Sequence, residues 1–385
     1  MELTQAFLGE RIARARERAD LSQGSLAELV GLTQSAISRI EAGERSVESL
    51  ELARLAKALD VSVLDLLEVR PLAEELRVAA RATEAVESAA LDQALNRVVD
   101  IVRLDQLVSV VDGGETTQPS VSIKGRELAD GDPLAQGKFL AKRMRREWGL
   151  NDDPMPSNFE SLVEDLSGLS IALEPLGEQV AGLYACVNDT AIALIDSSVP
   201  FGRQRFTVAH ELCHFLLRDN DKLIIDERLS GKSKAERRAN AFAAHFLMPE
   251  KSLRRYLRGR EPDEEVAIEL AYTFGVSLQA LLWQLFNLGL LPKSRRQRIQ
   301  EAGPKMLSVR YGYDDVWQRL EAERGIRRPP RRLRERTTSA YEQGSIGIEP
   351  LAELLGRKDP DALRRELEDQ GIGDRENWWE ETTPT

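Results

Sequence analysis

The sequence predicts a mainly α-helical protein with a small β-sheet, which places it in the α+β class. Ala, Leu, Glu and Arg dominate the composition and aromatic residues make up only 5%, a balance that favours helices. Two short β-prone runs, "VAGLYACVN" at 180–188 and "TAIALID" at 190–196, meet at Asn188-Asp189 as in a hairpin. A chain of 385 residues has the length of about two or three domains.

The bulk composition indicates a globular protein of the cytoplasm, with 42% hydrophobic and 30% charged residues. No run approaches about 18 apolar residues, and the N-terminal stretch lacks the apolar core of a signal peptide. Two cysteines, Cys186 and Cys213, cannot build a disulfide framework and suit a reducing compartment. The net charge of −11 argues against indiscriminate nucleic-acid binding, so any DNA contact must use a local patch.

Four parts follow one another along the chain. Residues 1–69 read as five short helices, and 70–133 as a helical connector that ends in a polar, glycine-rich linker. Residues 134–291 mix helices with the two β-prone runs, and 292–385 form a basic helical region with a frayed end. Within 72–111 the apolar spacing of three to four residues fits either a dimerising helix or a helix packed on its own domain.

The N-terminal part contains the layout of a helix-turn-helix motif. An amphipathic helix over 23–30 is followed by Gly31, which suits the turn. Thr33 is a good N-cap for a second helix, in which Ile37 and Ile40 face inward. This arrangement indicates a DNA-reading unit rather than a general helical bundle.

The second helix leaves a polar outer face that can reach base edges and phosphates, made by Gln34, Ser35, Ser38 and Arg39. Gln23, at the start of the preceding helix, is placed to contact a backbone phosphate. With "IEAGER" at 40–45 and "LARLAKALDVSVLDLL" at 52–67, the motif resembles the Xre/lambda-repressor-type helix-turn-helix family. The resemblance implies a five-helix domain over 1–69 that binds a double-stranded DNA operator, and a homodimer on a palindromic site.

The segment "RFTVAHELCHFLL" at 205–217 holds two of the three histidines of the chain. On a helix, His210 and His214 share one face, so their imidazole nitrogens can bind one metal ion. Glu211 projects to the side, where it can take a proton from an attacking water. The pattern predicts a zinc-dependent hydrolytic site.

A third ligand is needed, and the long form of the motif does not provide it, because Asn220 stands where that form has a histidine. Glu236 and His245 are the downstream candidates, nine residues or about 180° apart on one helix, so only one can face the metal. Small residues on the stripe of Glu236 favour it as the inward one: Ala239 and Ala243. Asn240 is expected to hydrogen-bond a ligand histidine.

With "FLAKRMRREWGL", "TAIALID" and "ERRANAFAAHFLMP", the HExxH segment resembles the ImmA/IrrE family of zinc metallopeptidases over roughly 134–291. The resemblance implies a zincin-like domain that binds Zn²⁺ through His210, His214 and Glu236. It also implies that Glu211 is the general base. Members of the family cleave repressors of the Xre class.

We therefore expect a transcription regulator whose endopeptidase cleaves a repressor, an antitoxin or itself, in a stress, mobile-element or toxin–antitoxin switch. The alternative is a non-proteolytic regulator whose peptidase-like domain senses a ligand or a partner. The run at 190–196 is expected to be an edge strand that accepts an extended substrate peptide. Residues 293–336 hold 14 Lys/Arg against 6 Asp/Glu. A solvated helix surface, or an intramolecular partner for the acidic N-terminal half, is favoured over contacts with phosphates.

Overall fold

The structure is a computed structural model that describes residues 5–59, 61, 63, 66, 76, 88–111, 131–177, 180–187, 190–217, 223–227 and 233–372. Helices dominate, and one four-stranded sheet is present, so the predicted α+β class is confirmed. The chain divides into two compact units, Met1–Ala79 and Ala80–Thr385. Each unit is described by itself below.

The smaller unit contains four described helices: α1 (Gln5–Arg18), α2 (Gln23–Val30), α3 (Gln34–Glu41) and α4 (Ser49–Ala58). Gly31 ends α2 in the left-handed region with φ 69°, and the Thr33 side chain accepts a hydrogen bond from the Ala36 amide, as predicted. Ile37 and Ile40 are buried in a core that also takes residues from α1, α2 and α4. The fifth predicted helix falls within 60–69, of which only 61, 63 and 66 are described.

The sheet of the larger unit contains β1 (Ser170–Glu174), β2 (Val180–Val187), β3 (Thr190–Asp196) and β4 (Leu223–Glu227) in the order β1-β3-β2-β4. β3 is therefore an interior strand, and the prediction of an edge strand at 190–196 is wrong. The reason is that β1 adds parallel to the side of β3 left open by β2, so Ala193 pairs with both Ile171 and Tyr184. The expected turn at 188–189 lies outside the described residues.

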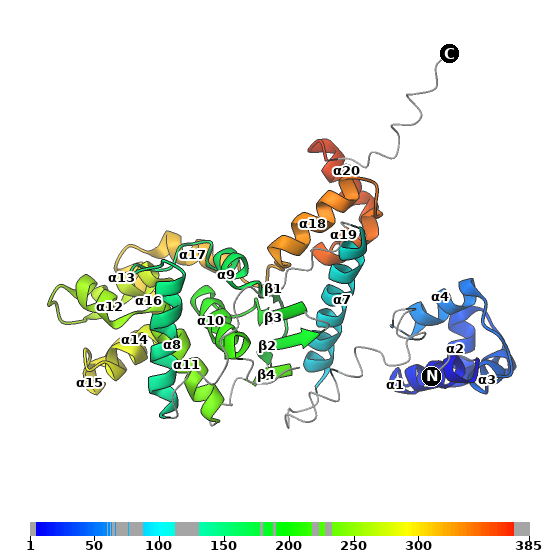
Figure 1. Cartoon of the computed structure of the whole chain (residues 1–385), viewed down its shortest axis with the longest axis horizontal. Helices are drawn as coiled ribbons and strands as arrows, with labels where there is room; N and C mark the ends of the chain where they lie inside the picture. The colour runs from blue at the N-terminus through cyan, green and yellow to red at the C-terminus, as the bar shows by residue number, and fades with distance from the viewer. Residues whose placement is uncertain are drawn as a thin grey trace, which may run out of the picture. The chain divides into compact units, whose positions relative to one another are not determined.

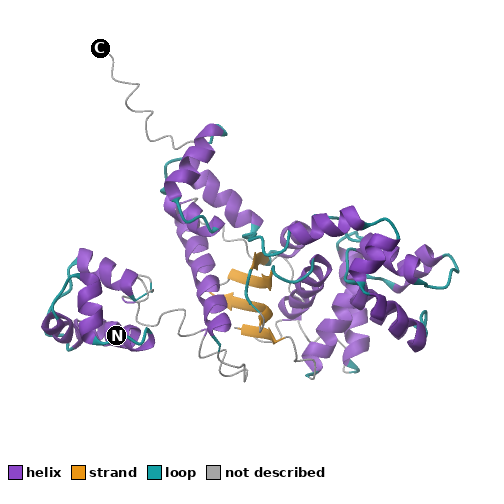
Figure 2. Ribbon diagram, turned by 180° about the vertical axis from the view of Figure 1, so that it is seen from behind, coloured by secondary structure: helices purple, strands orange, loops and turns teal. Residues whose placement is uncertain are grey.

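Two helices cover opposite faces of this sheet. α10 (Phe201–Leu217) packs on β2 and β3 from one side, and α7 (Ala89–Val111) packs on the same strands from the other (Figures 1 and 2). The buried side of α7 includes four of the apolar positions that gave the predicted spacing: Leu91, Leu95, Val98 and Val102. The described part of the connector that carries this pattern is thus a helix packed on its own unit, while 70–75, 77–87 and 112–130 lie outside the described residues.

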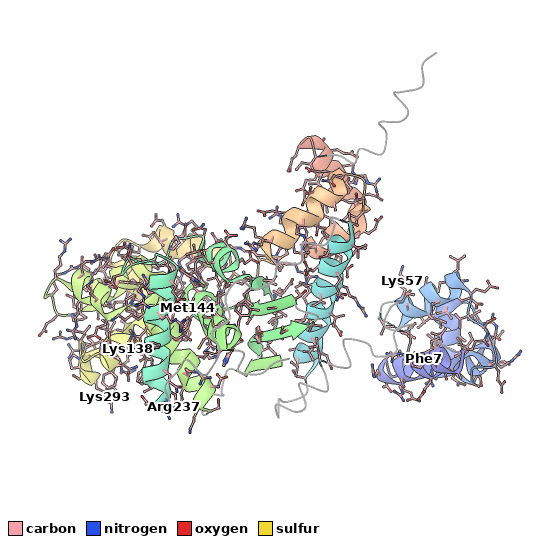
Figure 3. All side chains as sticks on the ribbon, viewed as in Figure 1. Phe7, Lys57, Lys138, Met144, Arg237 and Lys293 are labelled. Carbon is pink, nitrogen blue, oxygen red and sulfur yellow. The ribbon has the colours of Figure 1, made fainter. Side chains whose placement is uncertain are left out.

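Two further helices, α8 (Pro133–Glu147) and α11 (Lys234–Leu247), pack closely on each other. At Gly137 of α8 any side chain would collide with the Arg238 carbonyl oxygen, so the glycine permits the close approach. Met144 of α8 is fully buried, and it is labelled in Figure 3 together with Arg237 of α11. This packing fixes the first two turns of α11, which carry part of the candidate site.

The remaining helices surround these elements: α9 (Phe159–Ser167), α12 (Glu250–Leu257), α13 (Glu264–Phe274), α14 (Leu278–Asn287), α15 (Lys293–Ala302), α16 (Pro304–Arg310), α17 (Asp314–Ala322), α18 (Arg331–Glu342), α19 (Ile348–Leu355) and α20 (Pro360–Asp369). Among the described residues no single helix has the length and apolar character to cross a bilayer. Only α13 and α14 taken together, bent by 107° at their junction, pass that test.

The basic C-terminal region is held to the sheet by both backbone and charge. The amides of Leu173 and Arg328 each donate to the carbonyl of the other, at 2.8 and 2.9 Å, which adds an isolated bridge to the outer side of β1. Several arginines of the region pair with acidic side chains elsewhere in the unit, such as Arg336 with Asp105 at 2.6 Å and Arg295 with Glu261 at 2.5 Å. These pairs are intramolecular, as one form of the interpretation has it, but of these two acidic partners only Asp105 lies in the N-terminal half of the chain.

Candidate metal centre and DNA-reading helix

The HExxH segment forms the second half of α10, which is buried on almost every side. It lies between the sheet and α11, and His210, Glu211 and His214 are each at most 2% exposed. The apolar residues of the segment pack into the main core, among them Val208, Leu212 and Leu216. A buried helix that carries three titratable side chains within about one and a half turns calls for a chemical reason, because burying such groups is costly.

His210, His214 and Glu236 form a compact cluster whose ligand atoms lie within 4.8 Å of one another. The Nε2 atoms of the two histidines are 3.1 Å apart. Oε2 of Glu236 lies 3.2 Å from Nε2 of His210, and Oε1 lies 3.3 Å from Nε2 of His214. Bonds of about 2.0–2.2 Å to zinc in a tetrahedron place neighbouring ligand atoms about 3.3 Å apart. The separation of the two histidine nitrogens is close to that spacing, and each histidine has one oxygen of Glu236 at a similar distance, so the three side chains are suited to hold one zinc ion.

Glu236 reaches this cluster from the first turn of α11. The Ser233 side chain caps the helix by accepting from the Glu236 amide at 3.1 Å. In a capping box the N3 glutamate would turn back to the N-cap amide, whereas here its carboxylate lies against the histidines. Burial raises the pKa of the Glu236 carboxyl, but hydrogen bonds and charge from His210 and His214 outweigh it and bring the pKa down to about 2. An ionised carboxylate is the form that a metal binds.

His245 lies away from the cluster, in agreement with the angular argument that favoured Glu236. Its Nδ1 is 3.2 Å from the Gln284 side-chain nitrogen, on the far side of α11. Burial, with a smaller effect from Lys138, lowers the pKa of His245 to about 4. The imidazole is therefore neutral at physiological pH and serves packing.

The prediction that Asn240 hydrogen-bonds a ligand histidine is wrong, because Asn240 is exposed on α11. Four residues advance the helix by about 400°, so Asn240 lies about 40° beyond Glu236 and towards solvent. Ala239 and Ala243 fall on the inward stripe instead, and both are fully buried. The structure does not bring Asn240 to the cluster.

Gly182 of β2 is a residue of this site that the sequence reasoning missed. A side-chain carbon at this position would lie 3.3 Å from the Glu211 Oε1 atom and 2.7 Å from the Thr207 methyl carbon. The backbone of β2 therefore passes directly against the carboxylate of Glu211, at an irregularity in the pairing with β4. A glycine inside the apolar run "VAGLYACVN" was the available signal, since it commonly marks a bulge or a close backbone approach.

In the smaller unit, the predicted recognition helix α3 presents its polar residues to solvent. All four predicted contact residues are exposed: Gln34, Ser35, Ser38 and Arg39. Gln23 is half-buried, and its amide donates to Glu41 at 2.8 Å, while Arg16 pairs with the same carboxylate at 2.7 Å. The three side chains tie α1, α2 and the end of α3 together, so the donor of Gln23 is engaged within the protein.

Comparison with known proteins identifies both regions. A helix-turn-helix family model matches residues 12–66, and the model of the IrrE N-terminal-like domain, a peptidase family, matches residues 165–286. The chain joins a helix-turn-helix domain to an IrrE-like domain. The IrrE-like match includes α10, β2 and the start of α11, so it contains every residue of the cluster.

Two curated relatives carry the same name. The radiation response metalloprotease IrrE of Deinococcus deserti is 33% identical over 160 residues, which are 40% of this chain and 54% of that protein. Its namesake from Deinococcus radiodurans is 29% identical over 215 residues, which are 50% of this chain and 63% of that protein. The chain thus spans 54% and 63% of the lengths of these relatives.

Among solved structures, Bacillus thuringiensis PlcR in complex with the peptide PapR7 and DNA aligns over 95% of this chain and 99% of that chain. The identity is 13% and the TM-score 0.18, values too low to establish a common fold. At the level of domains, the helix-turn-helix implies binding to DNA, and the IrrE-like domain implies a metal and a protein substrate.

Proposed function

We propose that this chain is a DNA-binding transcription regulator whose IrrE-like domain is a zinc-dependent endopeptidase. The observation that carries the proposal is the cluster of two histidines and Glu236, whose ligand atoms lie within 4.8 Å of one another next to the buried Glu211. Four ligand positions of which the protein fills three are typical of catalytic zinc, whereas structural zinc has all four filled.

In the proposed reaction His210, His214 and Glu236 hold the zinc ion, which when bound supplies a Lewis acid for peptide hydrolysis. Glu211 takes a proton from the attacking water and passes it to the amine that leaves as the peptide bond breaks. Because Glu211 is fully buried, its charge acts in a medium of low dielectric, where electrostatic effects are strong. The absence of a side chain at Gly182 leaves room for this carboxylate against β2.

We further propose that the substrate peptide adds to the sheet at β4. Of the two end strands, β1 already carries the bridge to Arg328, whereas β4, within the residues that the structure describes, pairs only with β2. In sequence β4 lies between α10 and α11, the helices that carry the ligands. An extended segment of a repressor, an antitoxin or the chain itself would pair there through its main chain.

The helix-turn-helix domain is proposed to bind a double-stranded operator in the cytoplasm through the exposed residues of α3. One such domain reads one half-site, so we propose a homodimer on a palindrome. The name of the two relatives, radiation response metalloprotease, supports a stress response as the setting.

The proposed activity is tested with the purified full chain and its Glu211→Gln variant, mixed with repressor-like and antitoxin proteins encoded near its own gene. We expect wild type to cut one of them and the variant to leave it intact while still holding zinc, because Glu211 is not a ligand. If no protein is cut and the variant controls transcription like wild type, the non-proteolytic sensor is the correct interpretation.

A further inference from the structure

We propose that a second pocket of the larger unit binds a small organic acid as an effector. The pocket has a volume of about 500 Å³ and lies between α9 and β1 of the IrrE-like domain and the C-terminal helices α18 to α20. This volume falls within the range of small-molecule sites. The pocket lies apart from the metal cluster, so it is an additional site.

The lining of this pocket combines arginines with an apolar floor. Five arginines line it: Arg327, Arg328, Arg331, Arg334 and Arg357. Leu173, Leu355 and Leu363 supply apolar surface between them. Planar guanidinium groups bind carboxylates through paired hydrogen bonds, and the apolar floor suits a hydrocarbon body attached to such a head group.

The arginines differ in how far they are already engaged. Four of them pair with acidic side chains, for example Arg327 with Glu174 at 2.5 Å and Arg328 with Glu323 at 2.7 Å. Within the described part of the chain, Arg334 has no carboxylate at ion-pair distance, and it is exposed. Arg334 is therefore the group we assign to the incoming carboxylate.

Three glutamates also line the pocket, of which Glu366 is paired with Arg357 and the other two have raised pKa values. Burial raises the pKa of the Glu164 carboxyl to about 7 and also raises the pKa of Glu160. Near neutral pH Glu164 therefore carries a proton for part of the time, which lowers the negative charge that an organic acid would meet. A protonated carboxyl can also donate a hydrogen bond to a bound carboxylate.

The pocket is connected to α7 through one buried carboxylate. Glu174, at the end of β1, pairs through one oxygen with Arg327 of the pocket at 2.5 Å and through the other with Arg97 of α7 at 2.7 Å. Arg97 also donates to the carbonyl of Leu354 at 2.8 Å, at the end of α19. A ligand that binds Arg327 competes with Glu174 for this arginine. A shift of Glu174 alters its ion pair with Arg97 of α7, and in sequence α7 follows the DNA-binding unit.

The experiment is calorimetric titration of the zinc-loaded full chain with hexanoate, benzoate and succinate, with inorganic phosphate as a probe for the head group alone. Wild type is compared with Arg334→Gln and with Arg298→Gln, which removes another exposed arginine, from α15 and outside the pocket. We expect saturable binding of at least one acid. Affinity should fall about tenfold in Arg334→Gln and stay unchanged in the control.

Three results would overturn the proposal: none of the three acids binds, both arginine variants bind alike, or phosphate binds as tightly as every acid. Hydrogen exchange supplies a separate readout of the connection, since the bound acid should change the exchange of amides in 89–111. No step of the test depends on proteolysis, and the Glu211→Gln chain should bind the acid like wild type. Failure of the peptidase proposal is thereby distinguishable from failure of this one.

Discussion

Replacing Gly182 by alanine is expected to destabilise the larger unit and to displace Glu211. The new methyl group would lie 2.7 Å from the methyl carbon of Thr207 and 3.3 Å from the Oε1 atom of Glu211. Carbon atoms in contact normally lie about 3.5–4.0 Å apart, so the Thr207 contact alone demands a shift of about 0.8 Å or more. Both neighbours belong to the buried side of α10, which has little room to move.

The size of the effect follows from two opposing contributions. Overpacking of a tight core costs about 1–3 kcal/mol. Loss of glycine's extra freedom in the unfolded chain returns about 0.5–1 kcal/mol. We therefore expect Gly182→Ala to lower the free energy of unfolding by about 1–2 kcal/mol.

Urea unfolding followed by tryptophan fluorescence measures this quantity for the larger unit alone, because all five tryptophans lie after residue 80. Thr207→Ser is the matched second change: it removes the methyl group and keeps the hydroxyl that donates to the Arg203 carbonyl at 3.1 Å. The double variant Gly182→Ala/Thr207→Ser should regain most of the stability. Its cleavage of substrate should stay low, because the contact with Glu211 remains.

The reasoning is refuted if Gly182→Ala unfolds within about 0.5 kcal/mol of wild type, the scatter usual for neutral substitutions. It is also refuted if Thr207→Ser restores none of the lost stability, since the collision with the Thr207 methyl group would then not be the cause of the loss.

Three further predictions concern other parts of the molecule. Burial raises the pKa of Glu164 from 4.5 to about 7, so the folded chain binds that proton more tightly than the unfolded chain. The free energy of unfolding should therefore fall by about 3 kcal/mol as pH rises from about 4.5 to 7. Glu164→Gln should remove this fall in urea titrations, and an unchanged pH profile of the variant would contradict the prediction. Arg97→Met should lower the free energy of unfolding by about 2–3 kcal/mol, because the buried Glu174 loses its buried partner and keeps only the partly exposed Arg327, and a loss below about 1 kcal/mol would contradict the account. Gln34→Ala with Arg39→Ala should abolish sequence-specific operator binding in gel-shift assays at fixed salt without unfolding the exposed α3, whereas unchanged binding would point to another surface.

Features that depend on residues close in sequence could be predicted. Thr33 as N-cap and Gly31 as the turn follow from local preferences of the backbone, and both occur as expected. The choice between Glu236 and His245 needed only the angular repeat of one helix and the position of its small residues. The same angular repeat, counted four residues on from Glu236, places Asn240 about 40° away from Glu236. The prediction neglected this rotation and wrongly placed Asn240 beside the histidines.

Features that depend on distant segments could not be predicted. The order of strands is set by β1 pairing parallel to β3, and nothing within 190–196 distinguishes an interior strand from an edge strand. Likewise Arg97 and Glu174 are 77 residues apart in sequence, and their charges alone do not indicate a shared buried pair. Gly182 was predictable only in part. The sequence shows a glycine within an apolar strand, but it does not show that Glu211 lies next to it.

The central claim is that His210, His214 and Glu236 together hold zinc, and zinc content measured by mass spectrometry of the purified chain tests it most directly. We expect about one zinc ion per chain in wild type and in Asn240→Ala, whose side chain is exposed, and little or none in Glu236→Gln. A Glu236→Gln chain that keeps its full zinc content would contradict the account.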